Sequence, residues 1–423
     1  MVLKDNKTYI TFHSGILTIG GTVIEVAYND SHIFFDFGTE YRPELGLKEE
    51  SLDTLLKHRL VPELNIYDKR FNKGEDDDFN YTAVFLSHAH LDHSKMINYL
   101  DESIPLYMLD GTRAVLETMN EHGEFLIPSP FEEKNWTREM TGVDDNTHIQ
   151  VGDIDVEIVP VDHDAYGACG LIIRTPDKML AYTGDLRLHG FNKSLTPAFC
   201  QKAKHTDALM MEGVSISFPE SEPEFPDEPA LMDEFVRLIE ENEGRQISFN
   251  GYPANVYRFE QIVKRVPRTV VLNARMAALL LETCGMNVPY YYSEGQEHFA
   301  SLDPELEIPF ETLIDDHGQY LFQIEQEDIH HLRSGGLYLH SDAQPLGAFD
   351  PAYQPFLDDL ARRDIEFVRI ALSGHAFAED LDKIIAMIEP KLLLPIHTLK
   401  PEKLENPYGE RILPTRGQKI QLS

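Results

Sequence analysis

The sequence contains few of the features that would place it in an oxidising compartment or a membrane. Its 423 residues include only three cysteines, which are far apart in the chain: Cys169, Cys200 and Cys284. This odd number implies no disulfide framework and fits a reducing compartment. No apolar run approaches the roughly 20 residues of a membrane span, and Met1 to Lys7 hold no apolar signal core. We therefore expect a soluble, cytoplasmic protein with no membrane partner.

Basic residues are also scarce: 37 Lys and Arg stand against 72 Asp and Glu, a formal net charge of -35. Such a surface repels a polyanion unless basic side chains gather locally. The acidic blocks at 75–78 and 220–243 are typical of solvated faces or loops. The densest basic cluster indicates either a positive patch or a salt-bridged surface helix, and the sequence leaves both open. Its members are Arg258, Lys264, Arg265 and Arg268.

The most informative segment is the pattern His-x-His-x-Asp-His at 88–93. It follows an apolar run at 83–86 that predicts a buried strand, and we expect a helix over 94–100. The first two histidines can project to one side of an extended segment, while the aspartate and the last histidine turn away. One short peptide can therefore supply ligands to two metal ions. Imidazole and carboxylate donors together suit Zn²⁺, with Mn²⁺ as the alternative.

Several other predicted strands also end in a polar residue that can bind a metal or move a proton. These residues are His163, Asp185, Glu212 and His397. The recurrence predicts a site built along the edges of sheets, with ligands on the loops at strand ends. The candidate metal ligands are His88, His90, Asp92, His93, His163, Asp185 and His397.

The character of the sequence changes near residue 213. Four prolines between 219 and 229 mark a boundary, and beyond them helices alternate with strands, which predicts a parallel-sheet α/β unit. Asp185 and His397 are separated by 212 positions. We therefore predict one domain formed by 1–212 and 365–423, with a second domain inserted at 213–364.

These residues together resemble the metallo-β-lactamase superfamily. The resemblance implies an αββα sandwich in which one metal is held by His88, His90 and His163. It implies a second metal held by Asp92, His93 and His397, with Asp185 bridging both. The insertion, Glu212 and the segment Ser373-Gly374-His375-Ala376 are similar to the β-CASP branch, which includes ribonuclease J.

The resemblance implies a two-metal hydrolase, and most directly a phosphodiesterase that cleaves RNA with a metal-bridging hydroxide. Two Zn²⁺ ions, or Mn²⁺, would be the cofactors. Asp185 would orient the hydroxide, His375 would bind a phosphate oxygen or protonate the leaving oxygen, and Glu212 would hold the His375 imidazole. RNA is the expected partner, although the net charge of -35 opposes it. A homo-oligomer stays open.

Two other functions also stay open. One is a hydrolase of a small ester, thioester, lactam or phosphodiester, which the acidity suits better. The other is a non-catalytic metal-binding protein, although all seven candidate ligands are present. Around the histidines we expect nearby carboxylates to fix the rings, with Asp36, Asp162 and Asp164 as the candidates.

Overall fold

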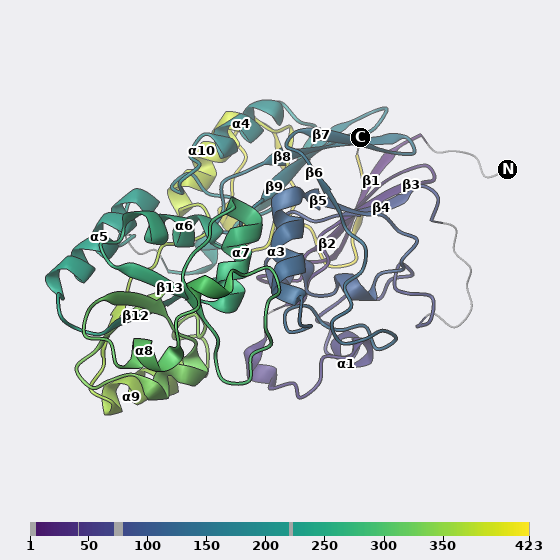
Figure 1. Cartoon of the computed structure of the whole chain (residues 1–423). Helices are drawn as coiled ribbons and strands as arrows, with labels where there is room; N and C mark the ends of the chain where they lie inside the picture. The colour runs from purple at the N-terminus through teal and green to yellow at the C-terminus, as the bar shows by residue number, and fades with distance from the viewer. Residues whose placement is uncertain (1–5, 41, 72–78, 220–222, 423) are drawn as a thin grey trace. The chain divides into compact units, whose positions relative to one another are not determined.

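The computed structural model describes residues 6–40, 42–71, 79–219 and 223–422 and divides the chain into two compact units (Figure 1). The first unit comprises Met1–Arg42, Gly46–Ser221 and Gly374–Ser423, and the second comprises Pro43–Leu45 and Glu222–Ser373. The acidic block 75–78 and the start of the block 220–243 lie outside the described residues. The predicted domain boundaries stay predictions, because a compact unit need not fold independently.

Two seven-stranded sheets form the described part of the first unit. The first sheet has the order β20–β1–β2–β3–β4–β5–β6. Its strands are β20 (Lys419–Gln421), β1 (Thr8–Ser14), β2 (Val23–Tyr28), β3 (Ser31–Phe35), β4 (Thr82–Phe85), β5 (Leu106–Leu109) and β6 (Thr141–Val143). The second has the order β19–β18–β11–β10–β9–β8–β7. Its strands are β19 (Glu410–Arg411), β18 (Leu392–Ile396), β11 (Ala208–Glu212), β10 (Met179–Tyr182), β9 (Cys169–Arg174), β8 (Ile154–Pro160) and β7 (Thr147–Val151).

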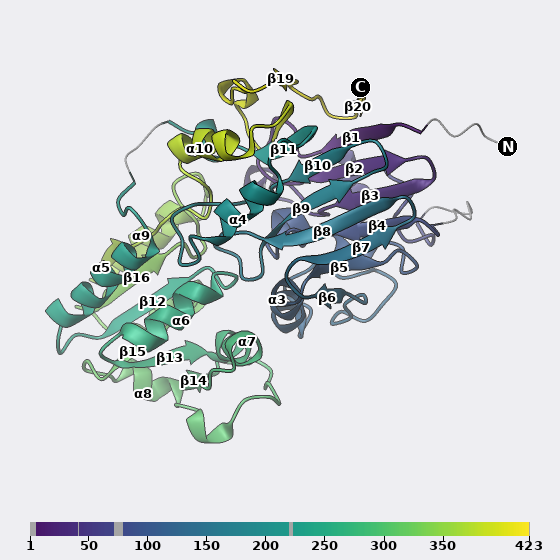
Figure 2. The same cartoon turned by 90° about the horizontal axis from the view of Figure 1, so that it is seen from above.

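The alternation of apolar side chains along each strand explains the layers. In β10, Leu180 and Tyr182 join the core between the two sheets, whereas Ala181 joins a second core on the opposite face. Such alternation follows from the two-residue repeat of a strand. The second core is closed by α4 (Leu195–Lys202) and α10 (Ala378–Ile388), which lie beside the second sheet in Figure 2. On the first sheet, α3 (Asp110–Asn120) packs against β5 and β6. The predicted αββα sandwich is thus confirmed.

The helix predicted over 94–100 is wrong in its position. The structure has a short helix α2 (Leu91–Ser94) and then a 3₁₀ turn, Ile97–Tyr99. The Ser94 hydroxyl donates to the carbonyl oxygens of Ala89 and His90 at 3.1 and 3.0 Å. Such a side-chain bond competes with the continuing helix. The helix therefore begins inside the motif and carries its aspartate and last histidine in its first turn.

The second unit contains a parallel sheet, as the alternation of helices and strands predicts. The strand order is β14–β13–β15–β12–β16–β17, and every pair is parallel. The strands are β14 (Tyr290–Tyr291), β13 (Thr269–Asn273), β15 (Tyr320–Gln323), β12 (Ile247–Gly251), β16 (Leu337–Ser341) and β17 (Glu366–Arg369). The α-helices are α5 (Glu228–Glu241), α6 (Val256–Arg265), α7 (Ala274–Cys284), α8 (Phe310–Ile314) and α9 (Tyr353–Arg362). In the first unit, α1 (Leu52–Lys57) completes the set. Across the described ranges, no helix is both long enough and apolar enough to pass through a bilayer.

Strand direction brings the polar strand-end residues together. In the second sheet, β10, β11 and β18 run parallel, and Glu212 pairs with Ile396. In the first sheet, β3 and β4 run parallel, with Phe35 paired to Phe85. Because parallel strands end at the same edge, the residues that follow them meet there.

Candidate metal centre

The carboxylate of Asp185 lies at the centre of the predicted ligands. It follows β10, and its Oδ2 faces a ring nitrogen of several histidines from separate loops. The distances from Asp185 Oδ2 are 3.2 Å to His93 Nε2, 3.5 Å to His397 Nε2, 3.6 Å to His88 Nε2 and 4.0 Å to His163 Nε2. The side chains of these histidines are at most 2% exposed. Groups from four loops thus meet at Asp185, and the four imidazoles around it are buried.

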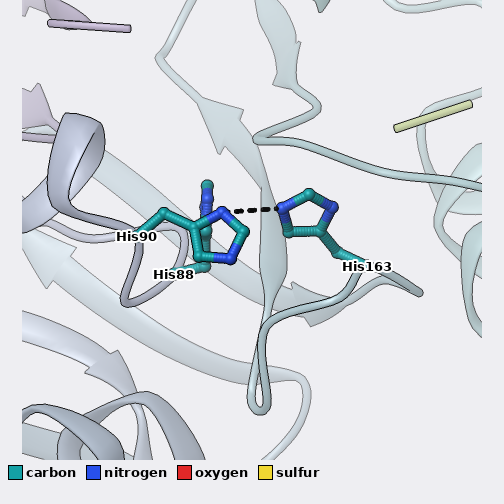
Figure 3. Close-up of side chains that lie close together, drawn as sticks. All are labelled: His88, His90 and His163. Carbon is teal, nitrogen blue, oxygen red and sulfur yellow. Dashed lines mark hydrogen bonds between the residues drawn. The ribbon is translucent and has the colours of Figure 1, made fainter. Parts of the chain in front are cut away.

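The other two predicted ligands join the same cluster. Asp92 Oδ2 lies 3.5 Å from His93 Nε2 and 3.7 Å from His397 Nε2. His90 Nδ1 lies 3.2 Å from His163 Nε2, beside His88 (Figure 3). The structure therefore brings all seven predicted ligands together. Two of the groups whose donor atoms lie within 4.8 Å of one another are His88, His90 and His163, and Asp92, His93 and His397.

Contacts outside the cluster fix the ring protons of two histidines. Asp36 Oδ2 accepts from His93 Nδ1 at 2.7 Å and from the Ser87 hydroxyl at 2.9 Å. Because the Ser87 proton goes to Asp36, His88 Nδ1 donates to Ser87 Oγ at 2.9 Å. In its neutral form, each ring then has an unprotonated Nε2 towards the cluster. This tautomer is the one that binds a metal through Nε2.

His163 and His397 are held by backbone groups. His163 Nδ1 donates to the carbonyl oxygen of Gly374 at 2.6 Å, which again leaves Nε2 facing the cluster. His397 differs, because its Nδ1 accepts from the N–H of Gly20 at 3.0 Å. The proton of a neutral His397 ring is therefore on Nε2, and a cation bound there would have to displace it.

The polar atoms of the cluster suit a cation. In the described part of the chain, the buried atoms that accept or donate no hydrogen bond include His88 Nε2, His93 Nε2, His397 Nε2 and Asp185 Oδ1. A buried polar atom left unpaired costs about 1–3 kcal/mol, so such a concentration is unusual in a folded protein. Nitrogen and carboxylate oxygen are also the donors that divalent metals prefer. The residues present could therefore hold a divalent metal.

Burial keeps most of these imidazoles neutral. It lowers the pKa of His163 to about 3 and also lowers the pKa values of His88, His90 and His397. A neutral imidazole can bind a metal through the ring nitrogen that lacks the proton. His93 is the exception: burial opposes its charge, but Asp185, Asp92 and Asp36 raise its pKa well above the ordinary value.

A further pair adjoins the cluster. His375 Nδ1 lies 3.2 Å from Glu212 Oε1 and 3.8 Å from Asp185 Oδ2. Burial would lower the pKa of His375, but Glu212 and then Asp185 outweigh it and raise the pKa to about 9. The His375 side chain is 21% exposed, more than that of any other histidine in the cluster. It is therefore the histidine that solvent or a substrate reaches most easily.

The structure decides between the two interpretations of the basic cluster that the sequence left open. Arg258 is 2% exposed and binds Glu228 and Asp342, while Arg265 pairs with Asp233 and Lys264 with Glu260. The salt-bridged helix, and not the free positive patch, is the outcome. The acids that pair with Arg258 are distant in sequence, so helical spacing alone could not reveal them.

Similarity to known proteins agrees with this geometry. The family model described as "Beta-lactamase superfamily domain" matches residues 68–221. Ribonuclease J of Helicobacter pylori is 23% identical over 413 residues, which cover 92% of this chain and 55% of that protein. Ribonuclease J of Mycoplasma genitalium is 21% identical over 418 residues, covering 93% of this chain and 68% of that protein.

A crystal structure of a protein of unknown function from Enterococcus faecalis V583 is 63% identical, with a TM-score of 0.94. The match covers 98% of this chain and 100% of that one. Residues 68–221 thus match the metallo-β-lactamase superfamily, and most of the chain is similar to ribonuclease J at 21–23% identity. The chain spans 55% of the length of the Helicobacter relative.

Proposed function

We propose that this protein is a metal-dependent ribonuclease, a hydrolase that cleaves phosphodiester bonds in RNA with two divalent cations. The observation that carries the proposal is the convergence of four histidine Nε2 atoms within 4.0 Å of Asp185 Oδ2. The name of the relatives, ribonuclease J, supports RNA as the substrate.

His88, His90 and His163 would hold one cation, and Asp92, His93 and His397 the other, with Asp185 between the two. Bound cations of this kind polarise a phosphoryl oxygen and acidify a water molecule. The mixture of imidazole and carboxylate donors favours Zn²⁺, with Mn²⁺ as the alternative. Elemental analysis of purified protein would decide the native metal.

His375 would act on the substrate itself. Glu212 Oε1 faces its Nδ1 at 3.2 Å, which fixes the ring beside the cluster. From there it can donate a hydrogen bond to a phosphate oxygen or a proton to the leaving oxygen. The Val214 N–H donates to Glu212 Oε2 at 2.8 Å and holds this carboxylate in turn. Glu212 is thus a positioning residue, and His375 is the group that touches the substrate.

A second candidate function is hydrolysis of a small phosphodiester or ester at the same site. Two observations favour it: the net charge of -35 and the pairing of Arg258, Lys264 and Arg265 with acids. Both disfavour a long polyanion. The two candidate functions share their metal chemistry and differ in the substrate, which is either a long polyanion or a small diester or ester.

The test compares 5′-monophosphorylated RNA with bis-p-nitrophenyl phosphate, with and without a chelator. We expect chelator-sensitive cleavage of RNA. The double variant His88→Ala and His90→Ala should abolish turnover while the fold, followed by circular dichroism, survives. Full activity in that variant would exclude the proposed site. Turnover of the small diester alone would favour the second candidate, and metal binding without turnover of either substrate would favour a non-catalytic protein.

The variant His375→Ala separates substrate handling from metal binding. It should lower turnover on RNA by about 10²–10⁴-fold, as expected for loss of an acid catalyst, while the metal content stays the same. His148→Ala is a matched control, because His148 is 52% exposed and pairs with Asp155. Loss of both cations from the His375→Ala variant would show that His375 has a structural role instead.

A further inference from the structure

Asp164 stands beside the cluster without belonging to the predicted ligand set. It follows His163 directly and turns its carboxylate back towards the histidines. We propose that Asp164 is an eighth ligand of the metal centre, a carboxylate donor to the cation held by His88, His90 and His163. This inference rests on the proposed function, because it extends the same metal centre.

The distances fit a shared ion. Asp164 Oδ1 lies 3.3 Å from His163 Nε2 and 3.5 Å from His90 Nε2. Two donors bound tetrahedrally to one ion at about 2.1 Å are about 3.4 Å apart. The carboxylate oxygen therefore borders the same space as the ring nitrogens.

The hydrogen bonding of Asp164 is incomplete in a way that points to a cation. Its side chain is 13% exposed, and Oδ1 is buried with no hydrogen-bond partner in the residues that the structure describes. A carboxylate oxygen is only an acceptor when ionised. An ion in front of it would satisfy both the lone pairs and the charge.

A glycine holds this carboxylate in place. A Cβ on Gly374 would lie 2.0–2.6 Å from the carboxylate atoms of Asp164. The carbonyl oxygen of the same Gly374 accepts from His163 Nδ1 at 2.6 Å. One residue thus packs against Asp164 and also orients His163. This close packing restricts the directions in which the Asp164 side chain can turn.

The competing role for Asp164 is that of an outer partner that only accepts a hydrogen bond from His90 Nε2. The two roles differ in their need for charge. The amide oxygen of asparagine can still accept that hydrogen bond, but it is a much weaker metal donor than a carboxylate. Asp164→Asn is therefore the decisive variant, and it nearly preserves the shape of the side chain.

The experiment measures metal binding directly. Wild type, Asp164→Asn and Asp164→Ala are stripped with chelator, their folds checked by circular dichroism, and then titrated with Zn²⁺ and with Mn²⁺. Bound metal per chain is read by elemental analysis, and Co²⁺-loaded protein by its visible absorption spectrum. Wild type should bind two ions. Both variants should bind one of them more than about 100-fold more weakly, beyond the 10–100-fold expected for an outer partner.

The loss should be larger for Mn²⁺ than for Zn²⁺, because Mn²⁺ depends more on oxygen donors. Asp207→Asn is the matched control. Asp207 precedes β11, at the end of the strand remote from Glu212, and pairs with Lys391. This variant should bind both ions like wild type and give the same Co²⁺ spectrum.

The outcomes separate this inference from the proposed function. If Asp164→Asn binds two ions within about threefold of wild type, Asp164 is no ligand, while RNA cleavage by wild type would leave the proposed function intact. If wild type itself binds no metal, both fail. If the Asn variant keeps both ions and only the Ala variant loses one, the outer-partner role is correct and the ligand role is wrong.

Discussion

Two buried polar clusters in this protein, around Arg258 and around Asp185, differ in how completely their polar atoms are hydrogen-bonded. In the second unit, Arg258 bonds both carboxylate oxygens of Glu228 at 2.7 and 3.0 Å, Asp342 at 2.7 Å and Ser341 at 3.1 Å. In the first unit, His88, His93 and His397 turn buried Nε2 atoms towards Asp185, and none of these atoms has a hydrogen bond within the residues that the structure describes. The first arrangement is complete as it stands, and the second fits an additional positive charge.

The completeness of hydrogen bonding distinguishes a structural cluster from a functional one better than the residue types do. A buried ion pair with all its hydrogen bonds holds elements together and has nothing left to offer a ligand. A buried set of lone pairs aimed at one point is destabilising until something binds there. We therefore expect substitutions in the Arg258 cluster to lower stability and substitutions in the Asp185 cluster to lower activity.

Asp185→Ala should have the largest effect. It removes the carboxylate that faces four histidine Nε2 atoms, and turnover should fall by about 10⁴-fold or more, as for loss of a central catalytic group. The thermal midpoint of the metal-free protein should change little. Metal content and single-turnover cleavage would measure the effect. If the variant kept its metal and its activity, the proposed contrast between the two clusters would be wrong.

Arg258→Ala should act on stability. The substitution leaves Glu228, whose side chain is 0% exposed, without its cation, and breaking such a pair costs about 3–5 kcal/mol. Urea unfolding would give this value. The metal content per folded chain should match wild type, and a loss of metal without loss of stability would contradict the structural role.

Glu25→Gln sharpens the comparison with a smaller, paired cluster. Glu25 lies 3.0 Å from His13 and 2.6 Å from His32. Burial opposes its charge, but the two histidines lower its pKa from 4.5 to about 2. Because the folded-state pKa is depressed, the stabilisation is complete above pH 4.5 and is lost as the pH falls towards 2. The variant should be about 1–2 kcal/mol less stable than wild type at pH 6.

The difference between Glu25→Gln and wild type should shrink steadily below pH 4.5, and urea unfolding at several pH values would follow it. A constant difference across that range would show that the carboxylate charge contributes nothing.

Arg265→Ala should have the smallest effect. Its partner Asp233 is 74% exposed, and solvent screening limits exposed pairs to about 1 kcal/mol or less. It lies on α6 like Arg258, so it is the internal control for that helix. A cost as large as that of Arg258→Ala would mean that burial does not explain the difference.

Much of the site was predictable because its ligands follow apolar runs. The runs before His163, Asp185 and His397 became β8, β10 and β18, and the parallel pairs β10–β11 and β11–β18 brought the ends of the last two strands to one edge. Local sequence could not predict contacts made by backbone groups. The Gly374 carbonyl that holds His163, the Gly20 N–H at His397 and the left-handed φ of 50° at His397 depend on tertiary packing.

The errors also have physical causes. Helical spacing placed Arg258 on a surface face, because the acids that bury it come from α5 and from the segment after β16. The misplaced helix at 94–100 followed from reading Ser94 as a helix start, whereas its hydroxyl bonds the carbonyls before it. The sequence predicted Asp164 only as a carboxylate that fixes a histidine ring. Its position next to His163 in the sequence does not show in which direction its side chain points.

The pairing of β1 with β20 has a consequence for the order in which the protein forms during synthesis. β1 can pair with β20 only after residues 419–421 have been synthesised, and His397 is also synthesised late. Chains fold domain by domain as they leave the ribosome. Residues 222–373 of the second unit therefore emerge while the first unit still lacks β20 and His397, so the predicted ligands can come together only after residue 397 has been made.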